Sequence, residues 1–177
     1  MSKTFYKCIL TGADDSLTDL VLPISNFSAR LKSGTPSYME VTVPNALDYI
    51  DGIAARPNGD IVVYHGLQED GAAIDWNEIA RVNFELAPYD KGAESKTVRI
   101  SGYKQTTYSS PSTVALTGVS GESLQSDGKM RVRAQVDYVV RPADTVTWNS
   151  GTDSMVAGMI TLTVSAEGQQ TMDITEA

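Results

Sequence analysis

The stretch Trp76-Asn-Glu-Ile-Ala-Arg-Val-Asn-Phe-Glu-Leu86 carries the longest strict alternation of apolar and polar residues in the chain. Its apolar members on one side are Ala80, Val82, Phe84 and Leu86, and its polar members on the other are Arg81, Asn83 and Glu85. Because successive side chains of a strand point to opposite faces, this alternation predicts a strand with one buried face. We expect residues 96–103 to pair with it across a loop at residues 90–94.

Other segments before this stretch also read as strands. Residues 4–10 are apolar, aromatic and β-branched, and they predict a first strand in which Cys8 shares a face with Tyr6 and Leu10. Residues 19–31 form one kinked strand or two short ones, since Pro23 lacks the N–H that a sheet requires. In residues 37–43, three apolar side chains share one face, those of Met39, Val41 and Val43. A brief helix with Asn45 as its cap is expected at residues 45–51.

The triplet Pro57-Asn58-Gly59 is a strong turn signal. Proline presets the first position of a turn, and asparagine and glycine tolerate positive φ, so we expect a hairpin between residues 53–56 and 60–64. A polar loop is predicted at residues 66–73.

Short β segments continue in the second half. Residues 106–113 are rich in Ser and Thr and predict a linker. After it come a strand-like run at residues 129–140, a turn at Arg141-Pro142-Ala143-Asp144, and short apolar segments at residues 145–148, 154–163 and 171–175. The sequence thus predicts an all-β protein with little helix, built of two small antiparallel barrels or sandwiches: a domain at residues 1–105, a linker at 106–113 and a domain at 114–177.

Composition excludes several classes of function. The 177 residues include 14 Lys and Arg against 22 Asp and Glu, a net charge of −8, which opposes extended contact with nucleic acid. No apolar run approaches the roughly 20 residues that span a bilayer, and no signal-peptide pattern opens the chain. We expect a soluble protein made in the cytoplasm, bound to neither nucleic acid nor membrane. The single cysteine permits no internal disulfide and no cysteine-based zinc site.

No catalytic constellation emerges from the residues. The Gly128-Lys129 pair lacks the rest of a phosphate loop, and no Gly-x-Ser-x-Gly motif accompanies the only histidine, His65. Weaker candidates are a Cys8–His65 dyad, Ser101 with Lys104, Ser126 with Lys129, and the acidic pairs Asp14-Asp15 and Glu69-Asp70. Each of these candidates has a simpler interpretation. Cys8 is expected to be a buried thiol, the two Ser-x-x-Lys matches do not lie in helices, and the acidic pairs are expected to be solvated loop residues. The sequence predicts no enzyme, cofactor, metal site or small-molecule substrate.

Two features are candidates for an interface. Lys129, Arg131 and Arg133 would share one face of a strand, which could meet an acidic surface of another copy or could be a solvated face with cross-strand partners. Trp76 and Trp148 are core or rim aromatics, or alternatively platforms on which a sugar stacks. A carbohydrate-binding β module is therefore the alternative function.

Short motifs in both halves resemble the hub and baseplate proteins of phage tails, the late-control-D-like hub family. The second half carries Asp127-Gly-Lys-Met-Arg-Val-Arg133, the Arg141–Asp144 turn and Gln170-Thr-Met-Asp-Ile174, and it is similar to the family's C-terminal part. The first half carries Phe27-Ser-Ala-Arg30, Met39-Glu-Val-Thr-Val-Pro-Asn45 and Gly59-Asp-Ile-Val-Val-Tyr64, and it is similar to the N-terminal barrel. Ala143 departs from the glycine of the pattern, and the chain is short for a complete hub.

The resemblance implies a compact or partial version of such a protein. It implies a non-enzymatic part of a phage or prophage virion tail, assembled in the cytoplasm of a bacterial host. It also implies self-association into a ring, such as a trimer, that docks other tail or baseplate proteins.

Overall fold

The computed structural model describes residues 2–13, 17–84, 90–91, 97–108, 110–165 and 169–177. It confirms the all-β class, with one short α-helix and two short 3₁₀ helices in the described part of the chain. The chain divides into two compact units. The N-terminal unit comprises Met1–Phe27 with Tyr38–Lys104, and the C-terminal unit comprises Ser28–Ser37 with Gln105–Ala177. The units are thus interleaved along the sequence, because the segment Ser28–Ser37 of the first half belongs to the C-terminal unit.

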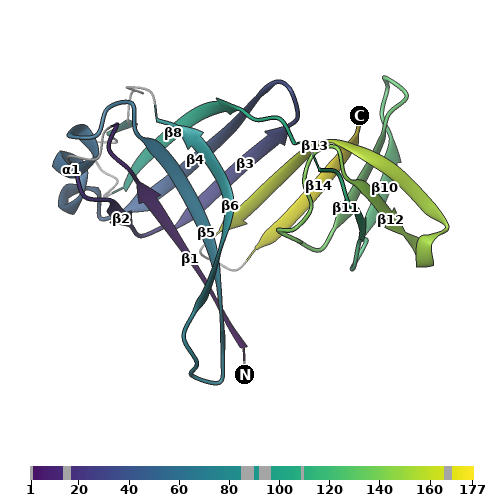
Figure 1. Cartoon of the computed structure of the whole chain (residues 1–177), viewed down its shortest axis with the longest axis horizontal. Coiled ribbons are helices and arrows are strands. Elements are labelled where there is room, and N and C mark those ends of the chain that lie inside the picture. Colours follow the sequence, from purple (N-terminus) through teal and green to yellow (C-terminus); the bar gives the residue numbers. More distant parts are fainter. Residues whose placement is uncertain (1, 14–16, 85–89, 92–96, 109, 166–168) are drawn as a thin grey trace. The chain divides into compact units, whose positions relative to one another are not determined.

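Antiparallel strands build the N-terminal unit (Figure 1). Its elements are β1 (Ser2–Leu10), β2 (Leu20–Leu22), most of β4 (Pro36–Pro44), η1 (Ala46–Asp48), α1 (Ile50–Ala54), β5 (Asp60–Glu69), β6 (Asp75–Asn83), β7 (Asp90–Lys91) and β8 (Thr97–Gln105). The strands lie in the order β4-β8-β6-β5-β1-β2, with β7 beside β8. The remaining strand of the first half, β3 (Asn26–Lys32), begins in this unit and continues into the other.

The alternating apolar and polar residues 80–84 lie in and directly after β6, a strand as predicted. Ala80, Val82 and Phe84 are buried, whereas Arg81 and Asn83 on the other side are not, and β6 adjoins β8 through the pair Asn83–Tyr103. Leu86 and Glu85 lie outside the described residues. The predicted strands at residues 4–10 and 37–43 are confirmed as β1 and β4, and Pro23 separates two strands, β2 and β3. The helices after Asn45 are brief, as expected, but the residue that precedes α1 as its N-cap is Tyr49.

The predicted hairpin around Pro57 is wrong. Residues 53–56 form no strand: Ile53 lies in α1 with its side chain fully buried, and the Arg56 guanidinium donates to the carbonyls of Gly52 and Thr18. β5 pairs instead with β1 on one side and β6 on the other. The turn itself is present, with Asn58 at a φ of 63°. A turn signal says where the chain bends, not whether the preceding residues are helical or extended.

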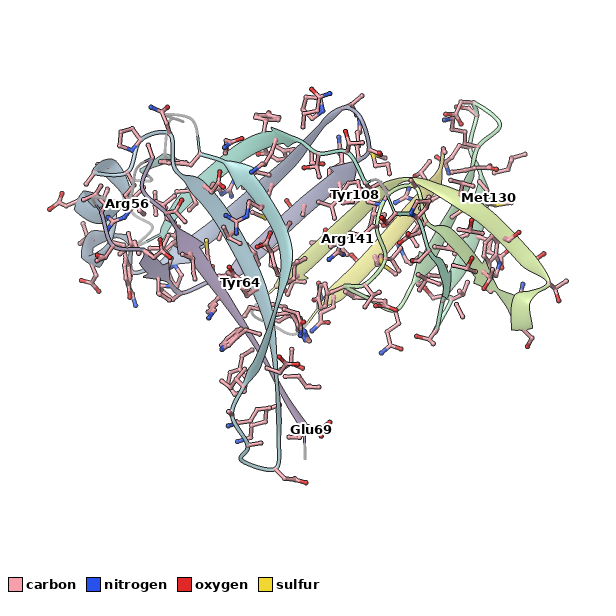
Figure 2. The ribbon with its side chains drawn as sticks, in the orientation of Figure 1. Arg56, Tyr64, Glu69, Tyr108, Met130 and Arg141 are labelled. Carbon is pink, nitrogen blue, oxygen red and sulfur yellow. The ribbon has the colours of Figure 1, made fainter. Side chains whose placement is uncertain are left out.

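The predicted polar loop at residues 66–73 is only partly confirmed: residues 70–73 lie in the connection between β5 and β6, but residues 66–69 are strand because β5 continues to Glu69. Gly66 pairs with Phe5 of β1 and Trp76 of β6, and a Cβ on it would lie 2.6 Å from Ile74 Cγ2. The glycine therefore leaves room for neighbouring side chains within a strand. Figure 1 shows β1, β5 and β6 extending as a narrow ribbon beyond the other strands of their unit, and Figure 2 places Glu69 near its far end.

The C-terminal unit is a small barrel-like arrangement of strands. Its elements are β9 (Thr113–Ala115), β10 (Gly121–Leu124), β11 (Met130–Ala134), β12 (Thr145–Trp148), η2 (Asn149–Gly151), β13 (Asp153–Ser165) and β14 (Gln170–Glu176), together with most of β3. β13 changes partners along its length: Asp153–Val156 pairs with β12, and the following residues pair with β14. The segment from β9 to β10 pairs first with β12 and then with β11, which joins the two ends of the arrangement. The β9–β12 pair is parallel; the other pairs described in this unit are antiparallel.

The three apolar segments predicted near the C-terminus are confirmed as β12, β13 and β14, but the strand-like run at residues 129–140 ends early. β11 stops at Ala134. Beyond it, the carboxylate of Asp137 accepts the backbone N–H of Val139 at 2.9 Å, a local turn that competes with sheet pairing. In the described part of the chain, no helix is long and apolar enough to cross a membrane.

Candidate functional site

A cluster of charges lies on the outer face of β10, β11 and β14. Arg133 donates from Nε and Nη2 to the carboxylate of Asp173 at 3.0 and 3.1 Å, and Arg131 Nη2 lies 3.0 Å from the same carboxylate. Arg133 faces Asp173 directly across the strands. Burial raises the pKa of Asp173, but hydrogen bonds from both arginines outweigh burial, so the pKa is lowered overall. The three side chains carry a net charge of +1 and form what we call the arginine cluster.

Two of the three predicted basic residues are therefore brought together, and they have the cross-strand partner that one of the two interpretations required. Lys129 does not join them, because it precedes β11 in the turn from β10. It lines a separate hollow of about 470 Å³ beside Val156, Met159 and Glu176.

The arginine cluster borders a hollow of about 340 Å³. In the pairing of β10 with β11, Gly121 lies opposite Arg133 and Ser123 lies opposite Arg131. The two smallest residues of β10 therefore lie beside the arginines. The hollow is lined by Ser120, Gly121, Glu122, Ser123, Arg131, Arg133 and Asp173. Small residues next to two guanidinium groups leave those groups open toward the edge of the sheet.

The two tryptophans lie in different surroundings. Trp148 is buried, and its indole N–H donates to Glu122 Oε1 at 2.8 Å, so the ring offers no open face to a sugar. Trp76 is half-buried on the ribbon, where the Lys7 ammonium lies 4.2 Å from its ring centroid and 5.1 Å from that of Tyr64, labelled in Figure 2. A cation already occupies one face of this ring. Neither position favours sugar stacking.

The other weak candidates for chemistry lie apart from this cluster. Cys8 is buried in β1, and burial raises the pKa of its thiol to about 12, which keeps the group protonated. Ser101 and Lys104 lie on β8, and Ser126 precedes Lys129 in a turn. Glu69 and Asp70 stand at the end of β5, whereas Asp14 and Asp15 lie outside the described residues. Among the residues described, no three His, Cys, Asp or Glu side chains gather as a metal site would require.

The turn from Arg141 to Asp144 is the most highly bonded of the predicted structural turns. Asp144 N donates to Arg141 O at 3.1 Å, and Pro142 and Ala143 occupy the two central positions. Asp144 is buried, and its carboxylate accepts Ser112 N at 2.7 Å, Ser112 Oγ at 3.1 Å and Arg141 N at 2.7 Å. The guanidinium of Arg141, labelled in Figure 2, donates back to the Tyr138 and Val140 carbonyls. The turn thus anchors the segment that leads into β9.

Ala143 adopts a φ of 79°, a left-handed conformation that disfavours any residue with a Cβ. This is the position where the family pattern carries glycine. We expect Ala143→Gly to raise the free energy of unfolding by about 1 kcal/mol, because strain is relieved at the second central position of the turn. Urea unfolding measures the change. Ala115→Gly in β9, an extended position, is the matched control and should be neutral or destabilising; a destabilising Ala143→Gly would contradict the strain.

An apolar row on β2, β1 and β5 was not predicted from the sequence. On the face of β1 and β5 that points away from the buried Cys8, Leu10 and Val63, the register places Val21, Ile9 and Val62 in one row. Val62 is buried and Ile9 half-buried, but Val21 is 57% exposed. Strands that are apolar on both faces are typical of sheets covered on both sides. The signal was available in residues 4–10 and 60–64, which alternate too weakly to have a polar face.

Comparisons with known proteins find likeness in structure only. No protein-family model matches the sequence, and no curated protein matches it. A tail protein from Neisseria meningitidis MC58 superposes with a TM-score of 0.58 at 5% identity, over 97% of this chain and 95% of that one. The E. coli c3393 protein gives a TM-score of 0.56 at 6% identity, over 96% of this chain and 76% of that one.

The second of these is described as a component of the type VI secretion system, structurally similar to the T4 bacteriophage tail proteins gp27 and gp5. A weaker likeness, with a TM-score of 0.49 at 7% identity, is to the 43 kDa tail protein of prophage MuSo2 from Shewanella oneidensis. The two structures with the higher TM-scores are thus a tail protein and a component of the type VI secretion system, and the likeness to each extends over nearly the whole length of this chain. This likeness shows a fold that the chain shares with both proteins.

Proposed function

We propose that this protein is a non-enzymatic structural subunit of a phage or prophage tail, placed at the hub or baseplate. In this role it associates with copies of itself into a ring and docks other tail proteins. The observation that carries the proposal is the agreement in fold with a tail protein over 97% of this chain and 95% of the other. Short motifs in both halves resemble the hub and baseplate proteins of phage tails, and this resemblance also supports the proposal.

Val21, the exposed end of the outer apolar row, supports self-association through the N-terminal unit, together with the half-buried Ile9 beside it, whereas Val62 at the other end is already buried within the unit. Apolar surface exposed on a sheet favours burial against a partner, at roughly 25 cal/mol for each Å² removed from water. A second copy is the partner that a ring-forming subunit always has available. We place the contact between copies on this row.

Val21→Asp is expected to dissociate the oligomer, because it introduces a charge into the buried centre of the contact. Light scattering over a series of concentrations should report the mass of a closed oligomer for the unchanged protein. For the variant it should report the mass of a single subunit. Since Val21 is 57% exposed, the fold itself should tolerate the change.

Val139→Asp is the matched control, since Val139 is exposed to 68% in the C-terminal unit. Its mass should equal that of the unchanged protein. If the unchanged protein is a monomer at every concentration, self-association is contradicted. If Val21→Asp still forms the oligomer, the contact between copies does not lie on the outer apolar row.

A further inference from the structure

The segment from β9 to β10 closes the arrangement through β9, which pairs with β12, but β10 itself lies at the end of the strand order of its unit. It pairs with β11 on one side, and among the described residues no strand pairs with its other side. All four of its residues, Gly121–Leu124, are exposed. The backbone N–H and C=O groups on the free side of such a strand can accept another extended chain.

The side chains beside this free edge favour an acidic ligand. Gly121 and Ser123 share the outer face with the arginine cluster, and the 340 Å³ hollow lies over them. Asp173 binds Arg133 through Nε and Nη2 and Arg131 through Nη2. The other N–H groups of the two guanidiniums have no protein acceptor in the described part of the chain. A guanidinium has five N–H donors, so each arginine keeps donors for a second carboxylate.

The spacing allows an added strand to reach these donors. A residue beside Gly121 on an added strand would lie two strand spacings, about 10 Å, from the backbone of β11. Arginine and glutamate are both long, and neither Gly121 nor Ser123 fills the space between them. Glu122, the one acid of β10, also lines the hollow, but by register it pairs with the buried Val132 on the opposite face, and its carboxylate already accepts the N–H groups of Trp148 and Asn149.

A second copy of β10 does not suit this edge. Antiparallel pairing of two β10 strands about a two-fold axis keeps both outer faces on the same side of the joined sheet. Two clusters, each with a net charge of +1, would then lie on the same side of the joined sheet with their β11 strands about 14 Å apart, and neither copy would supply a carboxylate to the other's free donors. The net positive charge of the arginine cluster is complementary to an acidic partner instead.

The geometry points to a docking edge at β10 for an extended segment of another protein that carries Asp or Glu at alternate positions. The segment adds to the sheet as a strand, and its acidic side chains enter the hollow and bind Arg131 and Arg133. This deepens the proposed function by naming the chemistry of one partner, and it rests on that proposal only for the partner's being a tail component.

The test uses the full chain and two synthetic heptapeptides. One has Glu at alternate positions in a Thr and Val background, and the other has Gln in place of each Glu. Titration is followed by two-dimensional amide NMR. We expect the Glu peptide to shift amides of β10 and β11 and to bind about tenfold more tightly than the Gln peptide, the effect of one or two charge-assisted hydrogen bonds.

Gly121 supplies the matched variants, because a Cβ there meets no atom within 4 Å. Gly121→Glu places the chain's own carboxylate in the hollow and should weaken the Glu peptide about tenfold, more than the equally large Gly121→Gln does. Equal binding of both peptides, shifts elsewhere in the chain, or no shift would overturn the inference. A chain that forms the ring but ignores the peptide overturns only this inference; one that binds the peptide but stays monomeric overturns only the ring.

Discussion

Asp144→Ala should lower the free energy of unfolding by about 4 kcal/mol, the largest effect that we expect from one side chain of the C-terminal unit. The carboxylate is 3% exposed and accepts three hydrogen bonds, two from Ser112 and one from the backbone of Arg141. Alanine leaves two backbone N–H groups without an acceptor, and each buried unsatisfied group costs about 1–3 kcal/mol. The start of β9 also loses its anchor.

Urea unfolding monitored by circular dichroism measures this loss. Asp137→Ala is the matched control, because that carboxylate also accepts a backbone N–H, at 2.9 Å from Val139, but at an exposed position. The control should cost less than about 1 kcal/mol. An Asp144→Ala variant no less stable than Asp137→Ala would show that the turn does not anchor the unit.

In the N-terminal unit, Gly59→Ala is expected to cost about 3 kcal/mol or more. A Cβ at this position would lie 1.9 Å from the carbonyl oxygen of Thr11. That backbone cannot retreat, since Thr11 N donates to Asp60 O at 3.0 Å and Thr11 Oγ1 accepts Asp60 N at 2.9 Å. Gly59 O also accepts Phe84 N, at 2.6 Å. Overpacking against fixed backbone breaks these hydrogen bonds or strains them.

The control for this variant is Gly121→Ala, the same substitution at a position where the added Cβ meets nothing within 4 Å. It should change the free energy of unfolding by less than about 0.5 kcal/mol. The two variants are compared by urea unfolding and by the amide NMR spectrum. If Gly59→Ala proves as stable as Gly121→Ala, the close approach of Gly59 to Thr11 does not exist in solution.

Gly59 also shows where reasoning from sequence succeeds for the wrong reason. The Pro57-Asn58-Gly59 triplet predicts a turn, and a turn is present, with positive φ at Asn58. Glycine was expected there for its tolerance of positive φ, but the structure needs it for the close approach of Thr11, the residue that follows β1. Thr11 lies 48 residues earlier in the chain, and no pattern near Gly59 indicates this contact.

The candidate site was predictable only in part. Alternate spacing indicated that Arg131 and Arg133 share a face, and β11 places them so. The prediction that Lys129 shares this face is wrong, because β11 begins one residue after it. The ends of a strand are where the sequence indicates secondary structure least clearly. Asp173, which binds both arginines, lies 40 residues from Arg133, and nothing in its own segment distinguishes it from other strand acids.

The sequence by itself determined the all-β class, the buried faces of β4 and β6, and the positions of the main turns. Each of these depends on residues within a few positions of one another, because side-chain period and turn chemistry are local properties. Only the tertiary structure decided which strands pair, that residues 53–56 are helical or in the following turn, and that Ser28–Ser37 joins the C-terminal unit. Pairing depends on contacts between segments far apart in the chain, so it is settled when the whole apolar surface is buried together.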